Sequence, residues 1–140
     1  MRATTLLKNL LGIKSTRVLG VRFDTEGIVC GVTPATTIPR CSGCGFKVRK
    51  VYDHRAGARR WRHLDACGMT VHLEYTMRRL DCRRCGVTTE LVPWAAPNSW
   101  FTDAFERTVG YLAQASSKTV VAEMMRVGWS TVSAIIRRLR

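Results

Sequence analysis

The chain has 140 residues, with 23 lysines and arginines against 10 aspartates and glutamates, which gives a formal net charge of +13. This length allows one domain or two small ones, with a modest core and no room for a large catalytic cleft. No apolar run approaches the ~18 residues of a membrane span, and the first residues lack the apolar segment of a secretion signal. We therefore expect a cytoplasmic protein in a reducing compartment, where disulfides do not explain the six cysteines.

The positive charge is concentrated in the middle of the chain. Residues 40–86 carry twelve basic and four acidic side chains, residues 1–39 carry five and two, and residues 87–140 carry six and four. A solvated surface is the ordinary explanation in a protein of balanced charge. At +13 a polyanionic partner is favoured, because neutralising phosphates releases condensed counterions. Nucleic acid is the predicted partner, and the basic residues do not form the amphipathic helix of a membrane-surface protein.

The predicted elements begin with a short helix, because leucines recur at helical spacing before Gly12. Alternating residues from 17 to 32, interrupted by a turn at residues 25–27, predict a β-hairpin. Two further strands are predicted at residues 59–64 and 69–80.

Two Cys-x-x-Cys-Gly units flank these later strands: Cys41 with Cys44, and Cys82 with Cys85. Two thiolates three residues apart on a tight turn can both bind Zn²⁺ at ~2.3 Å, and the glycine permits a positive φ beside them. The two pairs predict one four-cysteine site that holds a single structural Zn²⁺ ion. The interval between the pairs exceeds that of a simple zinc ribbon, so it should contain strands of its own.

Two alternatives remain open for the paired cysteines. Thioredoxin-like redox pairs require a βαβ context that the sequence lacks, and the other alternative is buried thiols without metal. Cys30 and Cys67 lie outside the pairs at strand-like positions, where single cysteines are usually core residues. No three ligands lie beside an acid with an open position, so catalytic zinc is not predicted.

The last third of the chain is predicted to be helical. Thr102 is a suitable N-cap, and the following segment TVVAEMMRVGWSTVSAIIRRL has the spacing of a helix-turn-helix. Arg126 stands where the commonest version of this motif has its turn glycine. A buried stripe at i, i+3, i+4 and i+7 on the last helix is formed by Val132, Ile135, Ile136 and Leu139.

The opposite face of the last helix is the predicted DNA-reading surface, with an ordinary amphipathic core helix as the alternative. Its members are short groups or guanidinium forks: Ser130, Thr131, Ser133, Ala134, Arg137 and Arg138. A second set, in the cysteine-containing segment, is expected to hold phosphate: Arg59, Arg60, Arg62, Arg78, Arg79, Arg83 and Arg84. All four tryptophans are expected to pack in the core or anchor the linker.

The predicted fold class is α+β, with a small zinc-ribbon-like antiparallel β domain around the four-cysteine site, followed by a helix-turn-helix domain. The predicted parts are a short helix and β-hairpin in residues 1–39, a zinc-binding β domain in residues 40–92, a linker in residues 93–101, and a DNA-binding helix-turn-helix in residues 102–140.

Residues 40–140 resemble the N-terminal part of the ISL-three family of bacterial insertion-sequence transposases. The resemblance rests on the order of the two cysteine pairs, RRWRHLD, RRLDCRRCG, PNSWFTDAFE and VVAEMMRVGWSTVSAIIRRL. It implies a zinc-binding domain and a helix-turn-helix that bind double-stranded DNA at the terminal inverted repeats of the element. In this family a DDE catalytic domain follows the helix-turn-helix.

The ten acidic residues of this chain are scattered through the binding region. The resemblance therefore implies a nucleoid-associated DNA-binding portion without strand transfer by this chain alone, and it is compatible with a homodimer of the full-length transposase. Two other readings stay open. The chain is a stand-alone zinc-dependent transcription regulator or transposition repressor, or it is an adaptor or RNA-binding ribbon.

Overall fold

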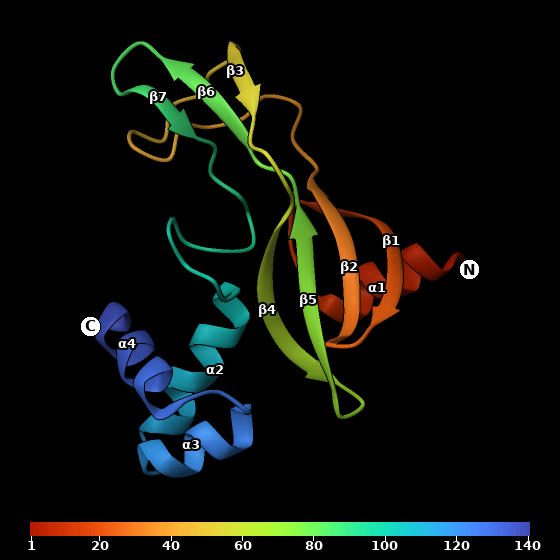
Figure 1. Ribbon diagram of the computed structural model, residues 1–140, viewed down its shortest axis with the longest axis vertical. Coiled ribbons are helices and arrows are strands. Elements are labelled where there is room, and N and C mark those ends of the chain that lie inside the picture. Colours follow the sequence, from red (N-terminus) through yellow and green to blue (C-terminus); the bar gives the residue numbers. More distant parts are fainter.

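A four-stranded sheet forms the centre of the molecule, in a computed structural model that describes residues 1–140 (Figure 1). Its strand order is β1-β2-β5-β4, with β1 and β2 forming one hairpin and β4 and β5 another. The hairpins meet through a parallel pairing of β2 with β5. The bounds are β1 Thr16–Asp24, β2 Gly27–Pro34, β4 Arg59–Ala66 and β5 Met69–Tyr75.

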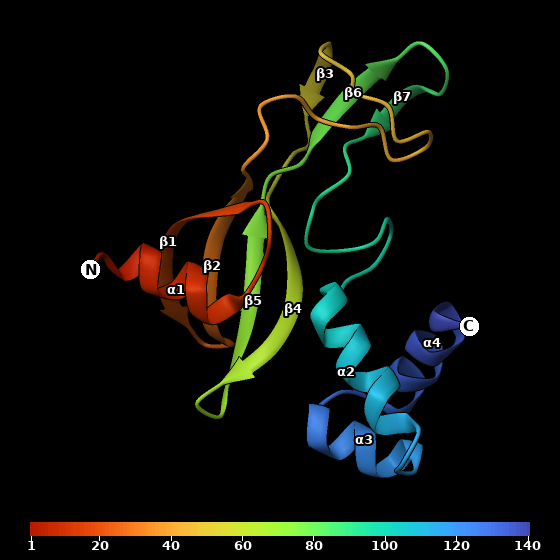
Figure 2. The same cartoon turned by 180° about the vertical axis from the view of Figure 1, so that it is seen from behind.

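Alternation along β4 and β5 buries one face of this sheet. Trp61 lies opposite Leu73 and His63 lies opposite Val71, and all four side chains are buried. The helix α1, Ala3–Leu11, crosses the sheet (Figure 2) and ends at Gly12, as predicted, where the glycine adopts a left-handed conformation. Its last leucine packs against the core of the sheet.

The apolar residues Leu19, Val21 and Phe23, which alternate along β1, are exposed. Strand β1 is at the edge of the sheet, and its register shifts between Val18 and Gly20. Val18 rather than this trio therefore packs against the core.

A second, three-stranded antiparallel sheet lies beyond the end of β5 (Figure 1). It contains β3 Val51–His54, β6 Arg78–Cys82 and β7 Gly86–Thr89, in the order β3-β6-β7. The strand predicted at residues 69–80 is thus two strands that serve different sheets. The strands within residues 40–92 divide between the two sheets, because β5 pairs with β2 as well as with β4.

Three helices follow: α2 Asp103–Ala113, α3 Lys118–Met125 and α4 Trp129–Leu139. Thr102 caps α2 and Ser117 caps α3, each accepting a hydrogen bond from a backbone amide of the first turn. The helices have a core of their own, in which Phe105, Val109, Val121, Val132 and Ile135 are buried. The α+β architecture predicted from the sequence is confirmed.

No helix of the structure is long and apolar enough to cross a membrane.

Candidate metal centre and nucleic-acid interface

The structure brings the four paired cysteines together. The Sγ atoms of Cys41, Cys44, Cys82 and Cys85 all lie within 4.8 Å of one another. The Sγ atoms of Cys44 and Cys82 are 3.7 Å apart, which matches the ~3.8 Å edge of a tetrahedron with metal–sulfur bonds of ~2.3 Å. Residues 38 positions apart thus supply one donor set, and four sulfurs in this arrangement fit Zn²⁺.

The pKa shifts of these thiols explain why a cation suits the site. Burial by itself raises the pKa of Cys41, but hydrogen bonds from Thr88 and from the amides of Cys44 and Gly43 outweigh it and lower the pKa to about 6. Desolvation and the neighbouring sulfurs of Cys41 and Cys44 raise the pKa of Cys85 to about 12. The sulfurs cannot all be thiolates unless a positive ion offsets their repulsion.

Gly43 is required by the packing of the sulfurs. A Cβ atom at this position would lie 2.9 Å from Sγ of Cys85 and 3.7 Å from Sγ of Cys41. The Gly43 amide also donates a hydrogen bond to Sγ of Cys41, at 3.3 Å. The variable residues of the first Cys-x-x-Cys pair therefore help to shape the site.

The remaining cysteines and His63 lie outside this cluster. Cys30 is buried in the core of the larger sheet, as expected, whereas Cys67 is exposed at the tight turn between β4 and β5 with φ of 52°. His63 is buried, with Nδ1 2.8 Å from Oγ1 of Thr102 and Nε2 3.2 Å from the carbonyl of Leu11. It links the sheet to the end of α1 and to the start of α2.

Four of the seven arginines expected to hold phosphate are paired with carboxylates of the chain. Arg78 shows the strongest arrangement, because its guanidinium forks onto Glu90, which is fully buried and also accepts a hydrogen bond from Tyr75. The pairs are Arg60 with Asp24, Glu26 and Glu74, Arg62 with Asp65, Arg78 with Glu90, and Arg79 with Asp53.

Arg83 and Arg84 remain free of carboxylates, on the turn of the second cysteine pair. Both are exposed, and the Arg84 guanidinium lies 4.2 Å from the ring centroid of Phe46. They line a groove of about 520 Å³ that also contains Lys47 and Arg49. Lys47 and Arg49 were not predicted from the sequence, although their position shortly after the first cysteine pair could have indicated them.

The predicted DNA-reading face of α4 also contains both free and paired side chains. Ser130, Arg137 and Arg138 are exposed, whereas Thr131, Ser133 and Ala134 are half-buried. Arg138 donates to the buried carboxylate of Glu106 on α2, with Nε 3.1 Å from Oε1. Arg137 has no ion pair within the chain, so it is the free cation of this face.

The orientation of the helices on the sheet is fixed by a junction of three charged side chains. Arg62 on β4 donates to Asp65 and to the carbonyls of Met125 and Arg126. Arg126 donates in turn to Asp65 and to the carbonyl of Gly68. We name Arg62, Asp65 and Arg126 the junction triad, and it ties the turn before α4 to the tip of the β4–β5 hairpin.

The tryptophans do not all pack as expected. Trp61 and Trp94 are buried edge-to-face in the core, with ring centroids 5.4 Å apart. Trp100 and Trp129 are 64% and 55% exposed. The prediction that Trp129 is a packing residue is wrong, whereas Trp100 lies in the linker with its side chain exposed.

Comparison with known proteins agrees with this arrangement. Residues 38–85 match the family model of the zinc-finger of transposase IS204/IS1001/IS1096/IS1165, and residues 90–140 match the helix-turn-helix domain of transposase family ISL3. The transposase for insertion sequence element IS1557 of Mycobacterium tuberculosis, in strains CDC 1551 and H37Rv, is 39% identical over 99% of this chain. The alignment covers 33% of those relatives, so the chain spans about a third of their length.

No solved structure matches the chain. The two domain matches cover the segments that hold the four cysteines and the three C-terminal helices, in the same order as in the fold. Over its zinc-finger and helix-turn-helix domains, the chain belongs to the ISL3 family of insertion-sequence transposases.

Proposed function

We propose that this chain is the DNA-binding portion of an insertion-sequence transposase and that it recognises the terminal inverted repeats of its element. Helix α4 enters the major groove, where the second helix of a helix-turn-helix reads base edges. Arg137 carries this proposal, because it is exposed on α4 and unpaired while its neighbour Arg138 is held by Glu106. Ser130 and Thr131 add short polar groups at the start of the same helix.

The four-cysteine unit contributes a second contact, to the phosphate backbone. One structural Zn²⁺ ion held by Cys41, Cys44, Cys82 and Cys85 fixes the turns that carry the free cations. Those cations are Lys47, Arg49, Arg83 and Arg84, and their positions beside one groove suit a run of phosphates. The arginines that are already paired with carboxylates serve the fold instead.

The remaining steps of transposition belong to a full-length transposase. The acidic residues in this chain mostly pair with its own arginines, and they form no cluster that holds two metal ions. This portion binds and positions the DNA ends, without strand transfer of its own, at the nucleoid in the cytoplasm. A homodimer of the full-length protein holds the two ends of the element.

The test is DNA binding by the zinc-loaded chain, measured by fluorescence anisotropy. One duplex carries the terminal inverted repeat of the element, and the other carries the same bases in permuted order. We expect the repeat to bind on the order of 10³-fold more tightly. The logarithm of the binding constant should fall linearly with that of the salt concentration, with a slope of about −0.9 per phosphate contact. Equal affinity for both duplexes would contradict recognition of the repeat, and tight binding only to a promoter operator would indicate a regulator.

A further inference from the structure

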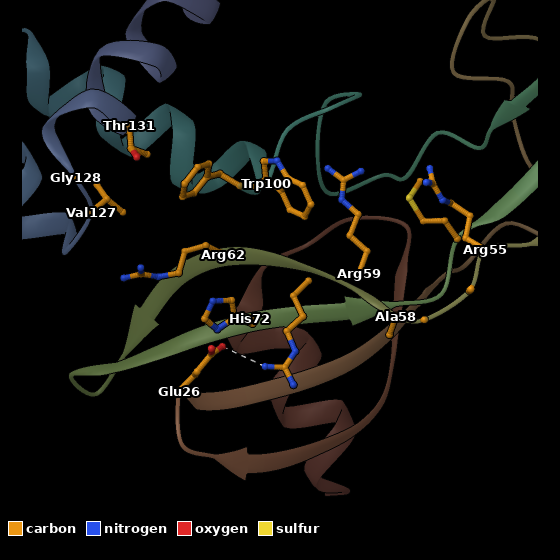
Figure 3. A pocket seen from close by; sticks show the side chains of 15 residues that line it. Glu26, Arg55, Ala58, Arg59, Arg62, His72, Trp100, Val127, Gly128 and Thr131 are labelled. Carbon is orange, nitrogen blue, oxygen red and sulfur yellow. Dashed lines mark hydrogen bonds and ion pairs between the residues drawn. The ribbon is translucent and has the colours of Figure 1, made fainter.

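A basic cleft lies between the larger sheet and the helix-turn-helix (Figure 3). Its volume is about 780 Å³, within the range of sites that bind small molecules or single nucleotides. Its walls come from the β1–β2 turn, the loop before β4, strands β4 and β5, the segment after β5, the linker, and the turn before α4 with the first turn of that helix. The residues that matter for its chemistry are Arg55, Arg59, Arg60, Arg62, Trp100 and Thr131.

Two of the four arginines in this cleft have no carboxylate partner. Arg60 and Arg62 are paired with Glu26 and Asp65, whereas neither Arg55 nor Arg59 forms an ion pair. Burial and the nearby charge of Arg55 lower the pKa of Arg59. The cleft thus holds positive charge that no acidic group of the chain neutralises, which favours an anionic ligand.

The Arg59 guanidinium is held in place before any ligand arrives. It donates to the carbonyl of Ser99 at 2.5 Å and lies 4.9 Å from the ring centroid of Trp61 and 4.5 Å from that of Trp100. Its Nε atom is buried without a hydrogen-bond partner. A guanidinium that is held in place in this way recognises an oxyanion at little cost in conformational entropy.

Trp100 provides an aromatic surface at the same place. Arg59 covers one side of the indole, and the side chain is still 64% exposed (Figure 3). The backbone of Trp100 is tied to β4, because its carbonyl accepts a hydrogen bond from the amide of Arg62 at 2.9 Å. A phosphate alone needs only the cations, whereas a fixed and exposed indole suits the face of an unstacked base.

The cleft also adjoins the helix that is placed to contact duplex DNA. Gly128, the N-cap of α4, and Thr131 in its first turn both line the cleft. The junction triad holds this turn against the sheet. A nucleotide in the cleft would therefore belong to the same DNA molecule as the base pairs in front of α4.

From these observations we propose that the cleft binds one unpaired nucleotide of DNA next to the duplex contacted by α4. The base stacks on the free face of Trp100, and its phosphate lies against Arg55 and Arg59. This inference rests on the proposed function, because it assumes that α4 lies on a duplex. It adds a ligand class and a pair of residues, Arg55 and Trp100, that the helix-turn-helix and zinc sites do not include.

The experiment compares two duplexes of about two helical turns, both of permuted sequence. One is fully paired, and the other has a single unpaired 2-aminopurine nucleotide in one strand. We expect the zinc-loaded chain to bind the second duplex more tightly and to quench its 2-aminopurine fluorescence. Trp100→Ala should remove about 10-fold of the affinity for the unpaired nucleotide together with the quenching, and leave affinity for the paired duplex unchanged. Trp100→Phe should retain part of both effects.

Tyr111→Ala is the matched control, because Tyr111 is an exposed aromatic residue on α2 outside the cleft. Unchanged quenching in Trp100→Ala, or an equal loss on both duplexes, would overturn the proposal. If the proposed function is wrong, the result is a different one: the chain binds the fully paired inverted repeat no more tightly than the fully paired permuted duplex. Circular dichroism of each variant checks that its fold is intact.

Discussion

Arg126 donates a hydrogen bond from Nε to Oδ2 of Asp65 across 2.9 Å, and this contact joins the helix-turn-helix to the β4–β5 hairpin. Arg126 has a left-handed backbone with φ of 55°, a conformation that is unfavourable for a residue other than glycine. Its side chain also donates to the carbonyl of Gly68. Glycine at this position would relax the turn but could not make either contact. The contacts of the arginine side chain therefore offset the strain of its backbone.

Asp65→Ala tests this anchor. The substitution removes the shared acceptor of Arg62 and Arg126, and both guanidinium groups lose their ion pair. Because these groups are partly exposed, we expect the free energy of unfolding to fall by only about 1 kcal/mol. We expect a clearer fall in affinity for the inverted repeat, since α4 is no longer held at one angle to the sheet. Urea denaturation and fluorescence anisotropy measure the two quantities.

Asp53→Ala is the control for that variant, because it removes one exposed ion pair, with Arg79, from the sheet β3-β6-β7. It should lower stability by less than Asp65→Ala does and leave sequence preference intact. A loss of preference in both variants would argue against a specific role for the junction triad.

Gly43→Ala tests the packing of the four sulfurs. A Cβ atom at residue 43 would lie 2.9 Å from Sγ of Cys85, so this ligand must move away from the metal position. We expect the affinity for Zn²⁺ to fall by about 10-fold or more, measured by competition with a chromogenic chelator. Gly20→Ala is the control, since a Cβ atom at residue 20 has no neighbour within 4 Å. Equal metal affinity in both variants would contradict the geometry of the site.

Removal of the metal should affect one unit far more than the other. The sheet β3-β6-β7 has few buried apolar residues apart from Leu80, whereas the helices have a separate core that contains none of the four cysteines. With excess chelator we expect loss of the NMR dispersion of residues 40–54 and 78–90, while α2 to α4 keep their signals. A metal-free protein with an unchanged spectrum would show that the cluster is not a structural metal site.

The sequence was sufficient for features that local spacing determines. The two cysteine pairs, the N-cap Thr102 and the end of the first helix at Gly12 follow from chemistry within a few residues. Sheet membership could not be predicted in this way. The alternation of β5 is equally compatible with either sheet, and its parallel pairing with β2 depends on residues more than 40 positions away.

The carboxylate partners of the arginines could not be predicted either, because they lie far away in the sequence. Arg60 reaches Glu74 and Arg79 reaches Asp53, 14 and 26 positions away in the chain. A count of basic residues therefore overstates the charge available to DNA. Exposed tryptophans were equally hard to foresee, because the sequence does not tell which of four indoles fill the core.

The buried His63 should make stability depend on pH. Desolvation lowers its pKa below the ordinary value of 6.5, despite a hydrogen bond to the carbonyl of Leu11. Below about pH 6.5 the unfolded chain takes up a proton that the folded chain does not, so the free energy of unfolding falls as the pH falls, by up to about 1.4 kcal/mol per pH unit. His63→Gln should reduce this slope between pH 6.5 and 5.5 in urea denaturation.

The same pH series on His54→Gln provides the reference, because His54 is exposed on β3 and belongs to no buried contact. The cysteine site is the same in all three proteins, so a difference in slope between the two variants reports on His63. A slope for His63→Gln as steep as the other two would show that His63 is not the titrating group.

Substitutions of Arg137 and Arg83 should separate base reading from phosphate binding. Arg137→Ala should reduce discrimination between the inverted repeat and the permuted duplex by about 1–3 kcal/mol, because an arginine on α4 can donate a bidentate pair of hydrogen bonds to guanine. Arg83→Ala should weaken binding to both duplexes alike and reduce the salt slope by about 1, as expected for one lost phosphate contact. Arg138→Ala distinguishes a free arginine from a paired one on the same helix, since its guanidinium is held by Glu106. We expect Arg138→Ala to lower stability without a selective loss of discrimination between the duplexes. Equal effects of Arg137→Ala and Arg83→Ala on the two duplexes would contradict the assignment of base reading to α4 and phosphate binding to the turn of the second cysteine pair.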